Sequence, residues 1–436
     1  MEERDNHAEA ARSSRALTFW GLLALVMGNL IGSGIYLLPA TLAPLGANAT
    51  LGWVVTIAGA MTLSFVFARL AAAIPRAGGP YAYADAAFGP VIGFATAWSY
   101  WTLVWAGNGA VAVAVVSALS LAFPALAPHA AIAAVVLVWV AVLVNIRGVD
   151  LAVKLQMTTM VIKLVPLAAV VLLAGWLLLT RGAGAVAHDV AVPLTVTGTA
   201  GAAALTFWGF LGVESATVPA DRVADARRTV PRATLVGTAA VGVIYLIVSS
   251  AITALMPRAA VAASPAPIAA FLGIAFGSGV AQVVALFAAV SALGALNGFV
   301  LLQGEVPRAM AQGGVFPRWF ARETAQGTPA RAHVVAGLLV TAVTLANFTR
   351  GMGDLFAFVA SVSLAAGMLA YLASALAAVK LLRDDPAARV VGVIAAVFVG
   401  WLSYGLGAEA NGWALVLLLA GVPVYLAVRR GGASAR

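Results

Sequence analysis

The sequence GNLIGSGIYLLP at residues 28–39 interrupts an apolar stretch with closely spaced glycines, and a related interruption, FWGFLGVESA, follows about 180 residues later at residues 207–216. A break in an apolar helix releases backbone N–H and C=O groups from their regular partners. In membrane proteins, two such broken segments at corresponding positions of two halves mark a substrate site near the middle of the bilayer. This pair of segments therefore predicts a transport site.

The composition predicts an integral membrane protein. Hydrophobic residues make up 63% of the 436 residues, charged residues make up 9%, and the mean hydropathy is +1.01. Such a chain cannot cover itself with polar surface in water. The formal charge of +9 is spread over short loops rather than gathered in an aromatic-rich patch, so nucleic acid is not expected as a partner. Cysteine is absent from the sequence, and we expect no cofactor and no metal.

About twelve apolar runs of roughly 20 residues are long enough to cross a bilayer. They start near Ala16, Leu51, Phe88, Ala130, Leu151, Thr197, Pro231, Ala269, His333, Leu355, Val390 and Trp413. Arginine and lysine concentrate in every second loop, which places those loops in the cytoplasm. Residues 1–16 lack the pattern of a signal peptide. We therefore predict a multi-pass protein of a bacterial inner membrane with both termini, residues 1–16 and 429–436, in the cytoplasm.

The spans are predicted to form two repeats of opposite orientation, because five is an odd number and the second copy must enter from the other side. Residues 17–180 would form the first repeat, residues 195–382 the second, and residues 389–428 two extra helices. The alternative is that two glycine-rich helices simply pack closely. Asn29 and Ser33 lie among the glycines and favour the open helix end, since close packing alone needs no polar residue.

Several ordered motifs carry a family resemblance. They are GNLIGSGIYLLPA at 28–40, PRAGGPYAYADAAFGP at 75–90, YWTLVWAGN at 100–108, LTFWGFLGVESATV at 205–218, LGALNGFVLLQGE at 293–305, GGVFPRWFAR at 313–322 and SVSLAAGMLAYL at 361–372. The chain resembles the amino acid–polyamine–organocation superfamily of transporters, and within it the bacterial arginine/agmatine antiporters. The resemblance implies an all-α LeuT-like fold with a five-plus-five inverted repeat, helices one and six broken and two further helices. It also suggests a homodimer.

An amino acid substrate brings a carboxylate and an ammonium, and both must be satisfied away from water. Free N–H groups at Ile31, Gly32, Ser33 and Gly34, at the positive end of the following half-helix, suit the carboxylate. Free carbonyls near Leu30, Trp208 and Leu211 suit the ammonium. The resemblance implies the same roles, with the Ser33 hydroxyl as a further donor.

For the substrate side chain the resemblance implies contacts with Leu103, Val104, Asn108, Phe299 and Ser363. At Phe299 the antiporters have a tryptophan that stacks on the guanidinium, and at Asn297 they have glycine. A phenyl face still attracts a cation by about 0.5–2 kcal/mol. Specificity for arginine is therefore open, and simple core packing is the alternative role of Phe299.

The resemblance implies gates at Tyr100, Trp208 and Glu214, with Tyr81 and Tyr371 as outlying members. Glu214 is an acidic residue in the middle of an apolar span, where a carboxylate is costly unless it is paired, protonated or hydrated. It is predicted to accept a proton or to sense a cationic substrate. The alternatives are a carboxylate that caps backbone amides at the break, and aromatic residues that only fill the core.

Lys163, in TTMVIKLVPL at residues 158–167, is one of three lysines in the chain and falls inside the fifth span. Proton-coupled members of the superfamily have a lysine at the matching place, where its ammonium replaces the sodium ion of other members and bridges the first and fifth helices. The resemblance thus implies sodium-independent transport, and burial of the ammonium would make Lys163 a candidate proton carrier. The alternative is that Lys163 reaches back to the membrane surface near Lys154.

The sequence leaves two transport functions open. Exchange of basic amino acids and amines, of the arginine/agmatine type, is favoured by Glu214. Proton-coupled import of neutral or broad-range amino acids is favoured by Lys163. An enzyme is not expected, because the four histidines are scattered and no metalloprotease or serine-hydrolase motif is present. The expected partners are an amino acid or amine, protons and the lipid bilayer.

Overall fold

A computed structural model describes residues 17–264, 266–277, 279–347 and 352–433. The predicted tail at 1–16 and residues 434–436 lie outside the described residues. The regular elements of the described chain are all helices. Within the described residues, eleven helical segments are long and apolar enough to cross a membrane, and α14 (Ala330–Asn347) adds a shorter apolar helix. The prediction of an all-α membrane fold with about twelve spans is confirmed.

The first broken helix consists of α2 (Phe19–Leu30) and α3 (Gly34–Leu42), separated by residues 31–33. Thr18 starts α2, and its hydroxyl accepts a hydrogen bond from the Gly21 amide at 3.2 Å. The second break follows α9 (Val196–Phe207), where the chain continues as short turns through residues 208–222. Gly212 has φ +101°, which a residue with a side chain rarely adopts. Both predicted breaks are present.

The remaining helices connect these segments. They are α4 (Ala47–Ala73), α5 (Pro80–Phe88), α6 (Pro90–Ala122), α7 (Ala130–Arg147), α8 (Val149–Arg181), α10 (Ala226–Leu255), α11 (Arg258–Ala262), α12 (Pro267–Phe276), α13 (Val280–Gln312), α15 (Met352–Leu381), α16 (Pro386–Gly405), α17 (Gly407–Leu419) and α18 (Gly421–Ala433). Short 3-10 helices are η1 (Ala43–Leu45), η2 (Pro124–His129), η3 (Gly182–Ala185), η4 (Trp208–Phe210), η5 (Ser215–Thr217), η6 (Ala220–Arg222) and η7 (Arg318–Ala321).

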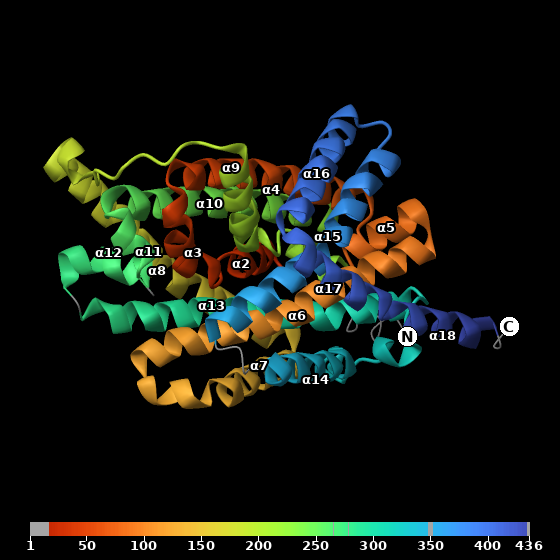
Figure 1. Cartoon of the computed structure of the whole chain (residues 1–436). Helices are drawn as coiled ribbons and strands as arrows, with labels where there is room; N and C mark the ends of the chain where they lie inside the picture. Colours follow the sequence, from red (N-terminus) through yellow and green to blue (C-terminus); the bar gives the residue numbers. More distant parts are fainter. Residues whose placement is uncertain (1–16, 265, 278, 348–351, 434–436) are drawn as a thin grey trace.

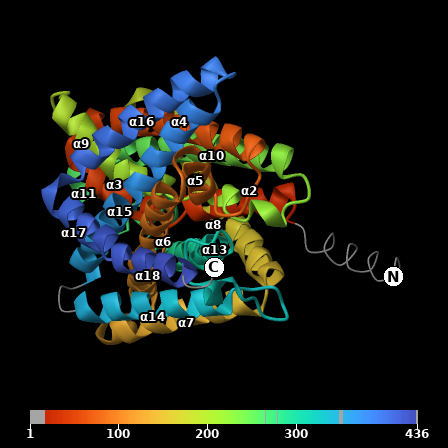
Figure 2. The same ribbon diagram turned by 90° about the vertical axis from the view of Figure 1, so that its right-hand side faces the viewer.

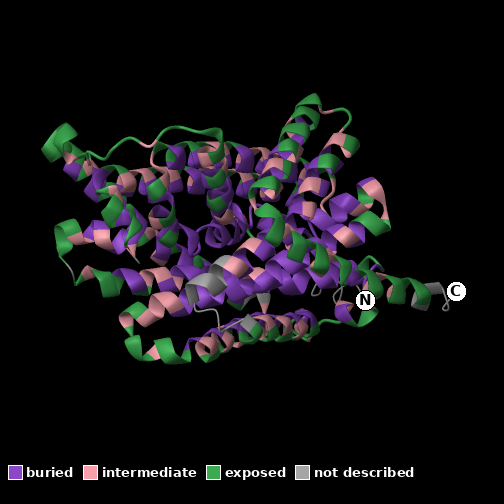
Figure 3. Cartoon of the chain, in the orientation of Figure 1, coloured by how far each residue is buried: buried purple, intermediate pink, exposed green. Residues whose placement is uncertain are grey.

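The helices pack in two main groups. One contains α2, α4, α9 and α10, and the other contains α6, α7, α13 and α14. In the second group α7 and α14 lie side by side at the edge of the molecule (Figures 1 and 2). Helix α8 contacts both α2 and α13 and so joins the groups. Figure 3 shows that α6 and the central part of α13 are largely buried, whereas α7 and α14 expose one side.

The two ends of the bundle differ in charge. Helices α5 and α18 lie toward one end, at the right of Figure 1, and α11 and α12 lie toward the other. The end with α5 and α18 is termed the basic end, because it holds Arg69, Arg76, Arg222 and Arg308. The sequence predicts that this end faces the cytoplasm.

Some predicted span starts are wrong for local reasons. The start near Ala269 falls in the short helix α12, which Gly277 ends with φ +77°, and the long helix α13 begins only at Val280. The start near Phe88 belongs to α5, which Gly89 separates from α6 with φ +84°. The last span begins at Gly407 rather than Trp413. The boundaries of the two repeats stay a prediction.

Candidate functional site

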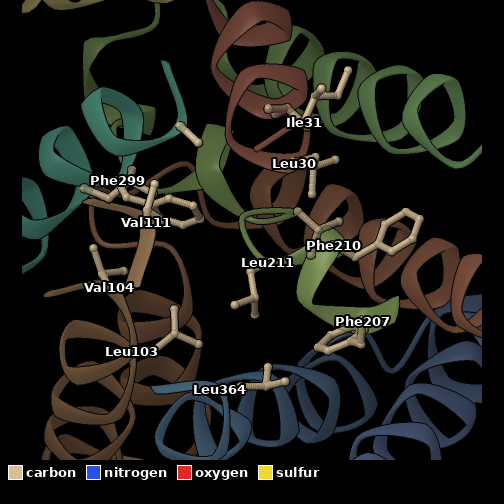
Figure 4. Close-up of a cluster of buried hydrophobic side chains, with 14 of the residues drawn as sticks. Leu30, Ile31, Leu103, Val104, Val111, Phe207, Phe210, Leu211, Phe299 and Leu364 are labelled. Carbon is tan, nitrogen blue, oxygen red and sulfur yellow. The ribbon is translucent and has the colours of Figure 1, made fainter. Parts of the chain in front are cut away.

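A small central cavity lies between the two breaks. Its volume is about 20 Å³, measured as the space open to the centre of a water molecule, which is room for about one water. It is lined by Asn29, Leu30, Gly32, Ser33, Gly34, Leu103, Val104, Gly107, Val111, Trp208, Gly209, Leu211, Ala295 and Phe299. Figure 4 shows the buried apolar side chains around this region, with Leu30, Leu103 and Leu211 of the cavity wall among them. The cavity is closed around a space smaller than an amino acid.

Most residues predicted to contact substrate line this cavity. They are Leu30, Gly32, Ser33, Gly34, Leu103, Val104, Trp208, Leu211 and Phe299. Ile31, Asn108 and Ser363 do not line it, although Ser363 Oγ would lie 3.6 Å from a Cβ atom placed on Gly107. The sequence reasoning missed Asn29, Gly107, Val111, Gly209 and Ala295, which carry no charge. Gly107 and Val111 lie three and seven positions after the predicted residue Val104, on the same helix face, so this spacing would have identified them.

Side chains of the protein occupy the carbonyls of the first break. Lys163 Nζ donates to the carbonyl oxygens of Gly28 at 2.8 Å and Ile31 at 2.6 Å. The Tyr245 hydroxyl donates to the Leu30 carbonyl at 2.5 Å. Lys163 is fully buried, so the alternative in which it extends to the membrane surface is wrong. Its ammonium lies between α8 and the end of α2, where the resemblance places it.

Hydrogen bonds at the two breaks correct several details of the predicted site. The Trp208 carbonyl is not free, because it accepts from the Leu211 amide at 3.4 Å, and the Gly32 amide is not free, because it donates to the Leu30 carbonyl. The Leu30 carbonyl is not free, because it accepts from both the Tyr245 hydroxyl and the Gly32 amide, the latter at 2.9 Å. The Ile31 amide is not free either, since it donates to Met27 at 2.8 Å. Donors for a carboxylate are left at the start of α3, where the first N–H groups of a helix have no partner within it. Ser33 Oγ has no hydrogen-bond partner among the described residues and lines the cavity.

The second break carries the buried carboxylate. Glu214 is fully buried, and its Oε1 accepts from the Tyr100 hydroxyl at 2.7 Å. Its Oε2 has no hydrogen-bond partner among the described residues. Tyr371 lies close enough to interact with this carboxylate electrostatically, without a hydrogen bond of normal geometry. Three predicted gate residues thus come together from α6, the second break and α15.

Trp208 lies between the central cavity and a larger one. The larger cavity has a volume of about 590 Å³ by the same measure and lies between α3, α9 and the start of α15. Gly34 and Trp208 line both cavities. Trp208 therefore separates the small central cavity from the larger one, which lies away from the basic end.

The basic end is closed by a cluster of charges, which comprises Asp221, Arg222, Glu305, Arg308 and Glu323. Arg222 contacts Glu305 at 2.9 Å and Glu323 at 3.3 Å. Arg308 contacts Glu305 at 2.7 Å and Asp221 at 2.9 Å. The side chains of Glu305 and Arg308 are 0% and 4% exposed. The sequence analysis used these arginines only for orientation and missed the cluster, because its members lie up to 102 positions apart.

Tyr81 lies at the basic end, away from the central cavity. A Cβ atom on Gly313 would lie 1.9 Å from its hydroxyl, so this tyrosine fills the space that Gly313 leaves. Burial, with a contribution from Asp85, raises the pKa of Tyr81 to about 12, and the hydroxyl stays protonated. Beside it the Gly78 amide donates to the Val218 carbonyl at 2.9 Å, which joins the turn before α5 to the second break.

A chain of buried amide side chains links the first break to the second group of helices. Asn29 Nδ2 donates to Ser215 Oγ at 2.8 Å, and Gln156 Nε2 donates to Asn29 Oδ1 at 3.3 Å. Asn297 donates to Gln156 Oε1 at 3.5 Å and accepts from Asn145 at 3.1 Å. Asn297, where the resembling antiporters have glycine, is therefore part of the helix packing and is not in the cavity wall.

No group of three histidine, cysteine, aspartate or glutamate side chains that could hold a metal occurs in the described part of the chain. The polar groups near the cavity are instead backbone amides and carbonyls, one carboxylate, hydroxyls and amides. Two broken helices around a small central cavity are the arrangement typical of secondary membrane transporters.

Comparison with known proteins agrees. The family profile described as amino acid permease matches residues 17–428, and the chain belongs to this family. A cadaverine/lysine antiporter of Escherichia coli is 34% identical over 366 residues, with 82% of each chain covered. An arginine/ornithine antiporter of Pseudomonas aeruginosa is 32% identical over 364 residues, which cover 78% of this chain and 73% of the relative.

The fold is shared more widely. A solved structure of a Na+-coupled sialic acid symporter, in a substrate-bound outward-open state, aligns with a TM-score of 0.56. The two chains are 13% identical over 91% of each, which shows the fold alone.

A further relative by sequence is a putrescine transporter of Escherichia coli, which is 25% identical over 413 residues, with 93% of this chain and 94% of the relative covered. This protein is a multi-pass transporter of amino acids or related amines.

Proposed function

We propose that this protein exchanges a basic amino acid for a diamine or related amine across the membrane, without sodium; arginine/agmatine exchange is one form of this activity. The single observation that carries the proposal is Glu214, a buried carboxylate at the second break with one oxygen unpaired among the described residues. A carboxylate in such a place attracts a cation. The relatives' names, a cadaverine/lysine and an arginine/ornithine antiporter, support cationic substrates.

The two breaks offer different chemistry to the two ends of a substrate. Lys163, Tyr245 and Ser291 already donate to carbonyls of the first break, which leaves the amides at the start of α3 for a carboxylate. The carbonyl of Leu211 at the second break, beside Glu214, suits an ammonium. A basic amino acid would use both breaks. A diamine has no carboxylate, so it would bind at the second break and leave the amides at the start of α3 unused. Both substrates could therefore compete for one site, as exchange requires.

The position of Lys163 supports the proposal of sodium independence. Its ammonium is bonded to the Gly28 and Ile31 carbonyls, which are the kind of ligand that a sodium ion would need. A second cation at the same oxygens would be repelled.

The test is uptake of labelled lysine and arginine into proteoliposomes that are empty or preloaded with unlabelled lysine, arginine, cadaverine, agmatine or a neutral amino acid. Each is measured with and without sodium and with and without an inward proton gradient. Uptake that requires a preloaded basic amino acid or amine and ignores sodium is the expected result. Uptake of a neutral amino acid into empty vesicles, driven by the proton gradient, would instead establish proton-coupled import, the second candidate that the buried Lys163 favours.

The role of Glu214 is tested by Glu214→Gln, which keeps the shape and can still accept from Tyr100. We expect the rate of exchange of cationic substrates to fall about tenfold or more, because a charged partner binds a cation more strongly than a neutral one. We also expect the rate to change less between about pH 5 and pH 8, because glutamine cannot take up a proton. Glu409→Gln, at an exposed position of α17, is the matched control. An unaltered pH profile in Glu214→Gln would rule out this role.

A further inference from the structure

Two buried amide side chains, Asn108 of α6 and Gln303 of α13, are bonded to each other beside the central cavity. Asn108 Nδ2 donates to Gln303 Oε1 at 2.7 Å, and both side chains are fully buried. The other two polar atoms of the pair, Asn108 Oδ1 and Gln303 Nε2, have no hydrogen-bond partner among the described residues. The pair therefore leaves one acceptor and one donor unpaired in the protein interior.

The pair lies directly next to the cavity wall. On α6, Asn108 is adjacent in sequence to Gly107 and one turn from Val104 and Val111, and these three residues line the cavity. Positions three or four apart share one face of a helix, so Asn108 shares the face of Val104 and Val111.

On α13, Gln303 lies one helical turn after Phe299, which also lines the cavity. The Trp101 indole N–H donates to the backbone carbonyl of Gln303 at 3.0 Å and fixes α13 against α6 at this level. The backbone of Gln303 is thus fixed against α6, and its side chain is bonded to Asn108 next to the apolar cavity wall that includes Val104 and Phe299.

An unpaired buried polar atom is costly, and a water or a polar group of a ligand can pair with it. The cavity of about 20 Å³ has room for about one water, so a substrate must enlarge it on binding. A substrate side chain that passes Phe299 would meet this pair next.

We infer that Gln303 is a specificity-determining residue, which holds the Asn108 amide so that the pair receives the terminal ammonium of a basic amino acid or diamine. This inference rests on the proposed function. An ammonium has three N–H donors and no acceptor, and it fits the unpaired Asn108 Oδ1. The apolar stem of the substrate packs on the wall before it. A substrate of the same length without a terminal donor leaves the acceptor unpaired and binds less well.

The test compares lysine with norleucine, which has the same carbon chain but no terminal ammonium. Lysine exchange in proteoliposomes is measured in the wild-type protein and in Gln303→Met, which keeps an unbranched side chain of similar size but cannot bond to Asn108. We expect the KM for lysine to rise about tenfold, because Asn108 without Gln303 is no longer held to accept a hydrogen bond from the charged ammonium, while the inhibition constant of norleucine stays the same. Equal changes for both ligands, or no change for either, would overturn the inference.

Controls separate this inference from folding and from the proposed function. Gln312→Met, an exposed position on the same helix, should behave as the wild-type protein does. Gln303→Asn keeps the amide but is too short to reach Asn108, and it replaces the methionine variant should that protein not purify as a single species. A wild-type protein without lysine exchange would contradict the proposed function and with it this inference. Wild-type exchange with an unchanged preference in both Gln303 variants would contradict the inference alone.

Discussion

One ammonium group determines how the first break is held. Lys163 donates to the Gly28 and Ile31 carbonyls on either side of the point where α2 ends. A lysine buried without partners would be costly, and the two carbonyls would be equally costly without donors. The three groups satisfy one another and keep the chain open between α2 and α3.

Replacement of this lysine should separate its structural and transport roles. In Lys163→Met the Gly28 carbonyl loses its side-chain donor and the Ile31 carbonyl keeps only Ser291, so we expect the free energy of unfolding to fall by about 1–3 kcal/mol. Exchange should fall about tenfold or more, because the first break is no longer fixed in place. Thermal unfolding in detergent and proteoliposome exchange measure these two effects. Lys154→Met, at an exposed position of the same helix, is the control, and a Lys163→Met protein equal to it would show that the ammonium is dispensable.

The two broken segments approach each other at a glycine. A Cβ atom on Gly212 would lie 2.9 Å from Asn29 Cβ and 3.3 Å from the ring of Phe299. Its φ of +101° adds a second reason for glycine at this position. The conformation of the second break thus depends on a glycine at position 212 as well as on the end of helix α9.

Gly212→Ala should therefore disturb the site more than the rest of the fold. We expect a loss of stability of about 1–3 kcal/mol from the strained backbone and the close contacts, together with a marked rise in KM. Gly201→Ala is the matched control, because a Cβ atom there meets no other atom within 4 Å. Ligand-dependent thermal stabilisation of both purified variants measures the effect, and equal stabilisation would contradict it.

The sequence predicts the breaks but not the partners of their backbone groups. Glycines among apolar residues are a local pattern, so the positions near residues 31–34 and 208–214 can be read directly. The donors to the first break come from distant positions, and Tyr245 is 215 residues from Leu30. Tyrosines and serines within apolar spans look alike in a sequence whether they face a carbonyl or pack in the core. For that reason the Leu30 carbonyl was expected to be free.

At the scale of the whole molecule, ion pairs connect the segments at the basic end, and the larger cavity lies toward the other end. The charge cluster joins the end of α13, the turn η6 and the loop before α14. Glu305 contacts both Arg222 and Arg308 and is fully buried, so its loss would leave two arginines with reduced compensation. The cavity of about 590 Å³ lies beyond Trp208, away from this cluster. Alternating access requires the reverse arrangement in the other half of the cycle.

Glu305→Gln should therefore favour opening of the basic end. Because the chain has no cysteine, a single Ala220→Cys substitution in η6 gives one buried position for a thiol reagent. We expect it to react about tenfold or more faster when combined with Glu305→Gln, since the loss of one charge from a buried ion pair destabilises the closed arrangement, and about 1.4 kcal/mol suffices for a tenfold change. Glu323→Gln, which removes a carboxylate that is 35% exposed, should have a smaller effect. Equal rates in all three proteins would show that the cluster does not hold this end closed.

The ammonium of Lys163 is attached to the chain, so it cannot leave on one side of the membrane and return on the other as a free ion does. A sodium gradient cannot then drive transport through this position, so the concentrations of the two exchanged substrates and their charges would set the direction of exchange. If a basic amino acid with one positive charge is exchanged for a diamine with two, each cycle moves one net charge. Such exchange is electrogenic, and the membrane voltage would bias it by about 2.3 kcal/mol per 100 mV.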